Sequence, residues 1–279
     1  MASVYRMLHV FTVGTSVLRN AAARAGSDPH LAPHASVLRS WAQASVDSSE
    51  DLEAGKSAVP GSPVFRDVLG AVAASPRSMS AELNAFLGLL DGLGEGSFEH
   101  RVCLLSTDSG AGWFSARVLE EFLKPMSSGI PGVYLSGDGL HRVVGTSSVR
   151  VTWLGRDFGK GLVNLLTEVK RAVSREAGWA DEVLFNLTGG FKPEAGFLAL
   201  AAGLMGVNRL YYIHESMGRV VELPVIPLKV ADHVERILRR AAAGELGEED
   251  YRALRELKIL KPWEKEAAWL SEVARVLLT

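Results

Sequence analysis

The sequence has little of what several classes of protein require. It contains one cysteine, Cys103, among 279 residues, which excludes a disulfide within the chain and a zinc site built from several cysteines. No apolar run reaches the roughly 20 residues that are needed to cross a bilayer. The first residues, 1–6, do not resemble a secretory signal. We therefore expect a cytoplasmic protein that makes no contact with a membrane.

An excess of charge of one sign is also missing. The chain has 30 Lys and Arg residues against 32 Asp and Glu residues, which gives a formal net charge of -2. Domains that coat long nucleic acids usually carry a strong basic excess, so we do not expect long nucleic acid as a partner. A small anionic ligand in a local basic pocket remains compatible with this composition. Hydrophobic residues make up 47% of the chain, enough for one large domain with or without an appendage.

Most of the chain alternates between apolar strand patterns and amphipathic helix patterns. The expected strands are 7–13, 102–105, 149–154, 183–187 and 209–214, and the expected intervening helices are 17–24, 113–124, 158–176 and 193–205. Residues 27–100 are rich in Ala and Ser and read mostly as helices. Such alternation predicts an α/β fold, in which helices cover both faces of a mainly parallel sheet.

The composition changes after Pro224 and Pro227, where charged helical patterns replace the strand and helix alternation. The expected helices are 229–243, 248–257 and 263–278. We therefore divide the chain into a main domain, 1–227, and a C-terminal helical appendage, 228–279.

Residues 186–194 read Asn-Leu-Thr-Gly-Gly-Phe-Lys-Pro-Glu and join an expected strand to an expected helix. The glycines let the backbone approach a ligand, Pro193 suits the first turn of a helix, and the N–H groups of that turn face an anion. Lys192 adds a mobile positive charge. The spacing matches neither a P-loop nor a dinucleotide-binding fingerprint, so the segment predicts a different phosphate cradle.

Parallel sheets bind ligands beyond the carboxyl ends of their strands, so the loops that follow the expected strands should lie along one edge. Besides Lys192 and Ser16, we expect ligand contacts from residues in four of these loops: Gly14, Thr15, Thr107, Asp108, Ser109, Arg156, Asp157, Thr188, Gly189, Gly190 and Phe191. No metal ligands and no cofactor are expected.

Four segments in order along the chain carry a resemblance to a known family. They are Thr-Val-Gly-Thr-Ser at 12–16, Ser-Thr-Asp-Ser at 106–109, the segment 186–194, and Tyr-Tyr-Ile-His-Glu at 211–215. Together they resemble CRISPR-associated proteins with a Rossmann-like CARF domain, and closest the stand-alone branch that includes the archaeal ring nucleases. The resemblance covers residues 7 to about 227.

The resemblance implies a function and two catalytic residues. Proteins of this type bind cyclic oligoadenylates, the second messengers of type III CRISPR defence, across a two-fold dimer interface. Ring nucleases cleave cyclic tetra-adenylate without a metal. We therefore expect a homodimer that binds one ring of cyclic tetra-adenylate, with Ser16 and Lys192 at the positions where the family's serine and lysine act.

Simpler interpretations stay open at several of these positions. Ser16 suits a helix N-cap, Asp108 suits a cap as well as a ligand contact, and Arg156 with Asp157 could form a surface ion pair. The Arg209-x4-His214 pattern resembles the signature of HEPN ribonucleases. However, that signature belongs on helices, whereas residues 209–214 read as a strand.

The appendage leaves a second function open. In place of an enzyme, the chain could be a non-catalytic sensor whose helical tail relays ring binding to DNA or to a partner. Arg236, Arg239 and Arg240 cluster in the tail, but four acidic residues follow within 245–250, which favours a helical dimer brace over a DNA-binding helix.

Overall fold

The computed structural model describes residues 4–124, 135–136, 139–190, 192–214, 218–261 and 268–278. Its sheet has the strand order β3-β4-β2-β1-β5-β6-β7. The strands are β1 Val4–Val13, β2 Ser97–Ser106, β3 Leu135–Ser136, β4 Leu140–Arg150, β5 Glu182–Asn186, β6 Arg209–His214 and β7 Arg219–Pro224. The five inner strands are parallel, and only the outer strands β3 and β7 pair antiparallel. This is the predicted Rossmann-like α/β sheet.

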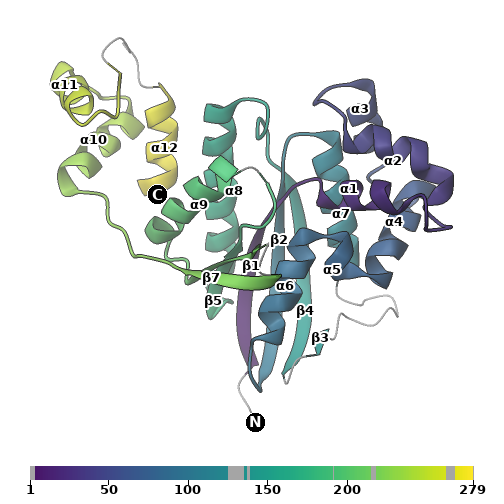
Figure 1. The fold of residues 1–279 in the computed structure, drawn as a ribbon. Coiled ribbons are helices and arrows are strands. Elements are labelled where there is room, and N and C mark those ends of the chain that lie inside the picture. Colours follow the sequence, from purple (N-terminus) through teal and green to yellow (C-terminus); the bar gives the residue numbers. More distant parts are fainter. Residues whose placement is uncertain are drawn as a thin grey trace.

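Helices cover both faces of the sheet (Figure 1). They are α1 Ser16–Arg24, α2 Ala35–Ala42, α3 Ser49–Lys56, α4 Pro63–Ala74, α5 Pro76–Met79, α6 Ala81–Asp91, α7 Gly110–Leu123, α8 Phe158–Glu176 and α9 Lys192–Met205, with a 3-10 turn at Ala32–His34. Side chains alternate across a strand, so Met7 and Phe11 of β1 pack with α1, α4, α6 and α7. Leu8 and Val10 face the opposite way, toward α8 and α9.

The C-terminal residues form three more helices, as expected: α10 Asp232–Ala243, α11 Glu248–Glu256 and α12 Ala268–Leu278. They enclose a small core of their own that includes Ile237, Leu254 and Leu270. In Figure 1 they lie beside α8 and α9, away from α1–α7. The Lys170 ammonium of α8 donates to the Val276 carbonyl at 2.5 Å, so α12 is anchored to a helix of the sheet domain.

The main error of the sequence prediction concerns the strand expected at 149–154. In the structure β4 ends at Arg150, and residues 152–156 form a turn. The strand begins nine residues earlier than expected, at Leu140, and its centre reads Gly-Thr-Ser-Ser at 145–148. These residues carry no apolar alternation because β4 lies near the edge of the sheet and only half buries its side chains. The first residues of β2 and all of β7 were also missed.

Three histidines cross the core in one hydrogen-bonded row. His9 Nε2 lies 3.0 Å from His100 Nδ1, and His100 Nε2 lies 3.1 Å from His141 Nδ1. At the other end of the row, His9 Nδ1 lies 3.1 Å from the Tyr211 hydroxyl. All four side chains are buried, and β4, β2, β1 and β6 each supply one of them.

Burial keeps these imidazoles neutral. It lowers the pKa of His100 to about 3 and the pKa of His9 well below its usual range, because a buried cation loses its hydration. His141 Nε2 has no partner among the described residues. A buried acceptor tolerates this better than a buried N–H donor. The row is therefore best satisfied with protons on each Nδ1, donating from His141 through His100 and His9 to Tyr211.

Stability should consequently fall as the pH falls below about 6.5. The unfolded chain binds protons on His9 and His100 near pH 6.5 while the folded chain does not. Each should therefore remove roughly 1.4 kcal/mol from the free energy of unfolding between pH 7.5 and pH 5.5. Urea unfolding at both pH values measures this loss. His100→Gln should shrink it, whereas the exposed His30→Gln should leave it unchanged. An unchanged loss in His100→Gln would contradict the assignment.

Candidate functional site

Two glycine turns meet at the carboxyl end of the sheet. One follows β1 and contains Gly14, and the other follows β5 and contains Gly189 and Gly190. A Cβ atom on Gly14 would lie 3.2 Å from the backbone nitrogen of Gly190, so the two turns are in contact. The Thr12 hydroxyl donates to the Gly189 carbonyl at 2.6 Å. Gly190 has φ +84°, a conformation that glycine adopts without strain.

The carboxylate of Glu82 contacts both of these turns. Its Oε1 accepts the Gly14 N–H at 3.1 Å, and its Oε2 accepts the hydroxyls of Ser16 at 2.5 Å and Ser80 at 2.8 Å. Glu82 is fully buried in the first turn of α6. A Cβ atom on Gly189 would lie only 2.3 Å from Oε1, so the second turn also rests against this carboxylate.

Ser16 does not cap its helix. The N-cap of α1 is Thr15, which makes no side-chain cap hydrogen bond, and Ser16 is the first helical residue. Its hydroxyl instead donates to Glu82 and accepts the Ala81 N–H at 3.3 Å. The N-cap interpretation is therefore wrong, and Ser16 is half-buried.

Thr188 fastens the second turn to the sheet. Its N–H donates to Asn186 Oδ1 at 3.1 Å, and its hydroxyl accepts the Ile213 N–H of β6 at 3.2 Å. Asn186 in turn donates from Nδ2 to the Glu82 carbonyl at 2.9 Å. The turn that precedes α9 is thus held on both sides by buried polar groups.

A second pair of loops, after β2 and β4, is tied together by Asp108. Its carboxylate accepts from Arg150 Nε at 2.9 Å and from the Trp153 N–H at 3.0 Å. Arg156 Nε donates to the Asp108 carbonyl at 2.6 Å, and the same guanidinium pairs with Asp47 at 2.7 Å. Asp108 therefore does not cap α7, and Arg156 pairs with Asp47 and Asp108, not with Asp157.

The N-terminus of α7 is closed by the protein's own groups. Ser109 caps it by accepting the Gly112 N–H at 3.0 Å, and the Thr107 hydroxyl lies 2.9 Å from that of Ser109. Asp51 of α3 accepts the Ala111 N–H at 3.0 Å. A carboxylate at this end of the helix already satisfies the dipole. Thr107 and Ser109 are buried, so both hydroxyls have local roles, and their contact with a ligand stays a prediction.

A hollow of about 290 Å³ lies between the first turns of α8 and α9. Arg156, Asp157 and Pro193 are among its lining residues. Asp157 caps α8 by accepting the Lys160 N–H at 3.0 Å. Nearby, Trp153 has φ +67°, which is strained for a bulky side chain. The residue is 43% exposed, and the Lys160 ammonium lies 5.0 Å from the centre of its ring.

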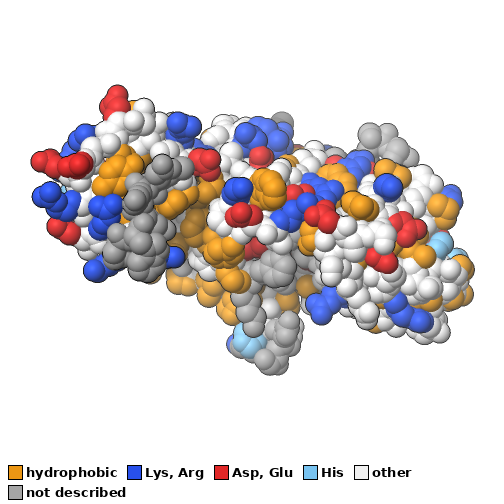
Figure 2. Space-filling view, turned by 90° about the horizontal axis from the view of Figure 1, so that it is seen from above, with side chains coloured by type: hydrophobic (Ala, Val, Ile, Leu, Met, Phe, Trp, Pro, Cys, Tyr) orange, Lys and Arg blue, Asp and Glu red, His pale blue; other side chains and the backbone are white. Residues whose placement is uncertain are grey.

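Figure 2 looks onto this edge of the molecule, where Lys and Arg side chains are interspersed with Asp and Glu. The structure brings the predicted residues together in two groups, Gly14–Ser16 with Thr188–Gly190, and Thr107–Ser109 with Arg156 and Asp157. Lys192 begins α9 directly beyond the glycine turn. Its side chain and Phe191 lie outside the described residues, so their roles stay predictions.

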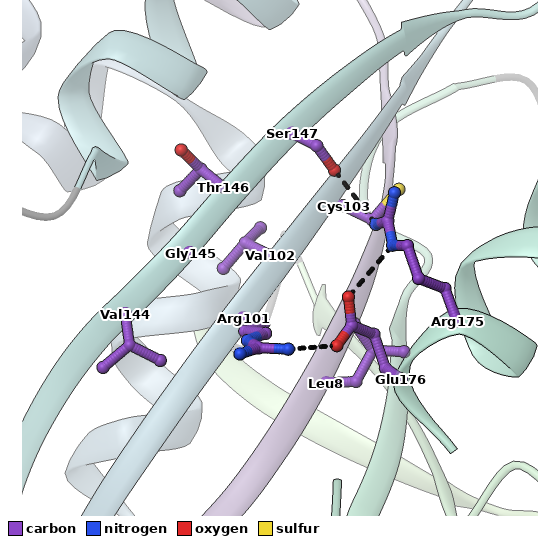
Figure 3. Close-up of a pocket in the computed structure, with 10 residues that line it drawn as sticks. All are labelled: Leu8, Arg101, Val102, Cys103, Val144, Gly145, Thr146, Ser147, Arg175 and Glu176. Carbon is purple, nitrogen blue, oxygen red and sulfur yellow. Dashed lines mark hydrogen bonds and ion pairs between the residues drawn. The ribbon is translucent and has the colours of Figure 1, made fainter. Parts of the chain in front are cut away.

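Another hollow, of about 330 Å³, lies on the α8 face of β2 and β4. Figure 3 shows Arg101 and Arg175 both directed at the carboxylate of Glu176. Arg175 Nε lies 3.0 Å from it, and Arg101 forms a shorter ion pair with it. Burial raises the pKa of the Cys103 thiol in the same wall, which disfavours a nucleophilic thiolate. Both guanidinium groups pair with this one carboxylate, so the lining residues carry one positive charge in excess.

The sequence patterns did not identify the buried residues that hold the loops of the site in place, namely Glu82, Asp51 and Asn186. Glu82 follows Ser80 by two positions at the start of α6, and an acidic residue in a first turn is expected simply to complement the helix dipole. Ser16 lies 66 positions away from Glu82. Only an expected contact between these two segments could have revealed the carboxylate as a partner of Ser16.

Among the described residues no group of three or more His, Cys, Asp or Glu side chains is arranged to hold a metal ion. In the same part of the chain no helix is long and apolar enough to cross a membrane. The family of CRISPR-associated proteins Cas_APE2256 matches residues 77–226, more than half of the chain. The chain belongs to this family.

The matched region of this CRISPR-associated protein contains one half of the candidate site but not the other. Residues 77–226 contain Glu82, Asp108 and the glycine turn with Lys192. The turn at 14–16 precedes the matched region. Membership of the Cas_APE2256 family therefore rests on the part of the fold from α5 to β7, which contains Glu82 and the glycine turn after β5 but not Ser16.

The contact beneath Gly189 predicts a strong effect of a single methyl group. In Gly189→Ala the new Cβ would overlap Glu82 Oε1 at 2.3 Å and the Thr12 carbonyl oxygen at 2.4 Å. We expect the free energy of unfolding to fall by about 1–3 kcal/mol, measured by urea denaturation.

Gly196→Ala is the matched control on α9. Nothing lies within 4 Å of a Cβ at Gly196, so this variant should be neutral or more stable by about 0.5–1 kcal/mol. Equal stabilities of the two variants would show that the glycine turn does not rest on the carboxylate.

Proposed function

We propose that this CRISPR-associated protein is a ring nuclease with a CARF domain. It binds cyclic tetra-adenylate in a homodimer and cleaves it without a metal to linear di-adenylate with a 2′,3′-cyclic phosphate. This reaction switches off type III CRISPR antiviral signalling. The observation that carries the proposal is the contact between the Gly14 turn and the Gly190 turn, which brings the start of α1 beside the start of α9.

The chemistry needs little from the protein beyond position and charge. A ribose 2′-OH can attack the adjacent phosphorus when it is held in line with the leaving 5′ oxygen. Such positioning is worth roughly 7–11 kcal/mol, and fixed donors stabilise the negative charge of the phosphorane. In this mechanism Lys192 stabilises that charge together with the first N–H groups of α9, and Ser16 orients the reacting groups.

Nucleobase recognition is supported by the second pair of loops. The hollow of about 290 Å³ is close to the lower limit for small-molecule sites, which suits one base rather than a whole ring. The exposed Trp153 ring offers a face for stacking, an interaction that every base can make. A ring with four adenines would have further bases left over for a second subunit.

Exposed hydrophobic side chains support self-association. In Figure 2 they gather between the C-terminal helices and the rest of the molecule. On the elements that border this junction, Phe158 is 65% exposed, Leu200 63% and Ile226 70%. Large exposed apolar patches mark interaction sites, and a two-fold partner would present the same residues in return.

One observation favours a sensor as the second candidate. Helix α12 packs on α8, and α8 begins at the hollow that borders the candidate site. A movement of the start of α8 on ligand binding could thus be transmitted to the C-terminal helices. In that case the ring would be bound and left intact.

Incubation of excess protein with cyclic tetra-adenylate in EDTA, followed by mass spectrometry, separates the two functions. The wild type should convert the ring to di-adenylate 2′,3′-cyclic phosphate. Lys192→Ala should lower the single-turnover rate by roughly 100-fold or more, since loss of one stabilising group of this kind costs about 10²–10³.

Lys229→Ala is the matched control, because Lys229 is 78% exposed and pairs with Asp232 ahead of α10. Its rate should equal that of the wild type. A wild type that binds the ring but leaves it intact would support the sensor. A wild type that does not bind the ring would exclude both candidates.

A further inference from the structure

We infer that Glu82 and Ser16 form a proton relay, in which Ser16 accepts the proton of the attacking ribose 2′-OH and passes its own to Glu82. The inference rests on the proposed function and specifies what Ser16 does in it. In this arrangement Ser16 binds the attacking ribose 2′-OH, and the phosphate binds at the start of α9.

The direction of the Ser16 hydroxyl follows from its partner. Glu82 accepts three donors, the Gly14 N–H and the hydroxyls of Ser16 and Ser80, which is the hydrogen-bonding pattern of a carboxylate. The Ser16 proton therefore points to Glu82 over 2.5 Å. A hydroxyl has one proton, so Ser16 cannot donate to a phosphate oxygen while this contact lasts.

The remaining capacity of Ser16 is that of an acceptor. Its oxygen has two lone pairs, and among the described residues the Ala81 N–H takes one at 3.3 Å. The other takes no hydrogen bond from the described residues, and because Ser16 is only half-buried it can accept one from a bound donor. A ribose 2′-OH is such a donor. A phosphate oxygen is not, and it would also be repelled by the buried Glu82 carboxylate.

The atoms balance in one displacement. The bond from the 2′ oxygen to phosphorus forms while the bond from phosphorus to the 5′ oxygen breaks. The 2′ proton moves to the Ser16 oxygen as the Ser16 proton moves to Glu82. The departing 5′ oxygen takes a proton from water. Because Glu82 is fully buried, it later returns its proton to Ser16 while Ser16 gives one to water. Ser16 ends the cycle unchanged and forms no covalent bond.

Glu82→Gln tests the relay because the amide has the same shape but is a far weaker base. We expect this variant to bind cyclic tetra-adenylate within about threefold of the wild type. Its single-turnover rate in EDTA should fall at least 100-fold, as general-base catalysis contributes about 10²–10⁴-fold. The single-turnover rate of Ser16→Ala should fall by a similar factor. The double variant should be no slower than the slower single variant, since groups that act as one unit are not additive.

Ser80→Ala is the matched control. It removes one donor from Glu82 but keeps both members of the relay, so its rate should stay within about threefold of the wild type once thermal melting confirms folding. If Glu82→Gln does not fold, Ser16→Ala and Ser80→Ala carry the test, and equal effects of the two would overturn the relay.

The other outcomes are equally decisive. A folded Glu82→Gln that cleaves like the wild type, or that loses affinity and rate in proportion, overturns the relay while the ring-nuclease proposal stands. Multiplicative losses in the double variant overturn it too. A wild type that leaves the ring intact overturns the proposed enzyme and the relay together, and the two failures are told apart by the wild-type reaction alone.

Discussion

The candidate site depends on one buried carboxylate. Glu82 accepts hydrogen bonds from Gly14, Ser16 and Ser80, and its own carbonyl accepts one from Asn186. A charge buried without partners would cost several kcal/mol, so the loop after β1, the start of α1 and the residue before α6 are held where they satisfy it. The interaction that closes the fold at this edge is thus the one that positions the candidate catalytic serine.

The sequence distance between interacting residues decides which parts of the structure were predictable. Helix α8 and strand β6 have the predicted bounds because their apolar spacing repeats every 3.6 or every 2 residues within one short window. Strand β4 was misplaced because Gly145–Ser148 lie near an edge and need no apolar pattern. The glycine turn was readable because Gly189, Gly190 and Pro193 are adjacent in sequence. Glu82 was not, because its partners lie 66 and 104 positions away.

The charged side chains at this edge restrict where an anionic ligand can bind. Arg156 was expected to contact ligand, but it pairs with both Asp47 and Asp108, and Arg150 also pairs with Asp108. An anion at these loops must compete with carboxylates already in place, and the dipole of α7 is satisfied by Asp51. The start of α9 also carries a carboxylate, because Glu194 is buried in its first turn and its Oε2 would lie 2.9 Å from a Cβ atom on Gly190. In the proposed function Lys192 offsets this carboxylate, and the hollow beside α8 takes a base.

The buried polar groups also bear on whether tight binding would mean catalysis. Asn186 contacts the Glu82 carbonyl. Burial raises the pKa of Tyr211, a hydrogen bond with Asn186 partly opposes that rise, and Tyr211 ends the row of histidines. The site therefore rests on a continuous network of buried hydrogen bonds, in which His141 Nε2 at the far end has no partner among the described residues, and such a network leaves the site little freedom to rearrange around a ligand. A rigid site that fits the intact ring as well as the transition state would only bind it. Catalysis then requires a group whose interaction strengthens during the reaction, and in the described structure the Ser16–Glu82 pair is placed to supply one.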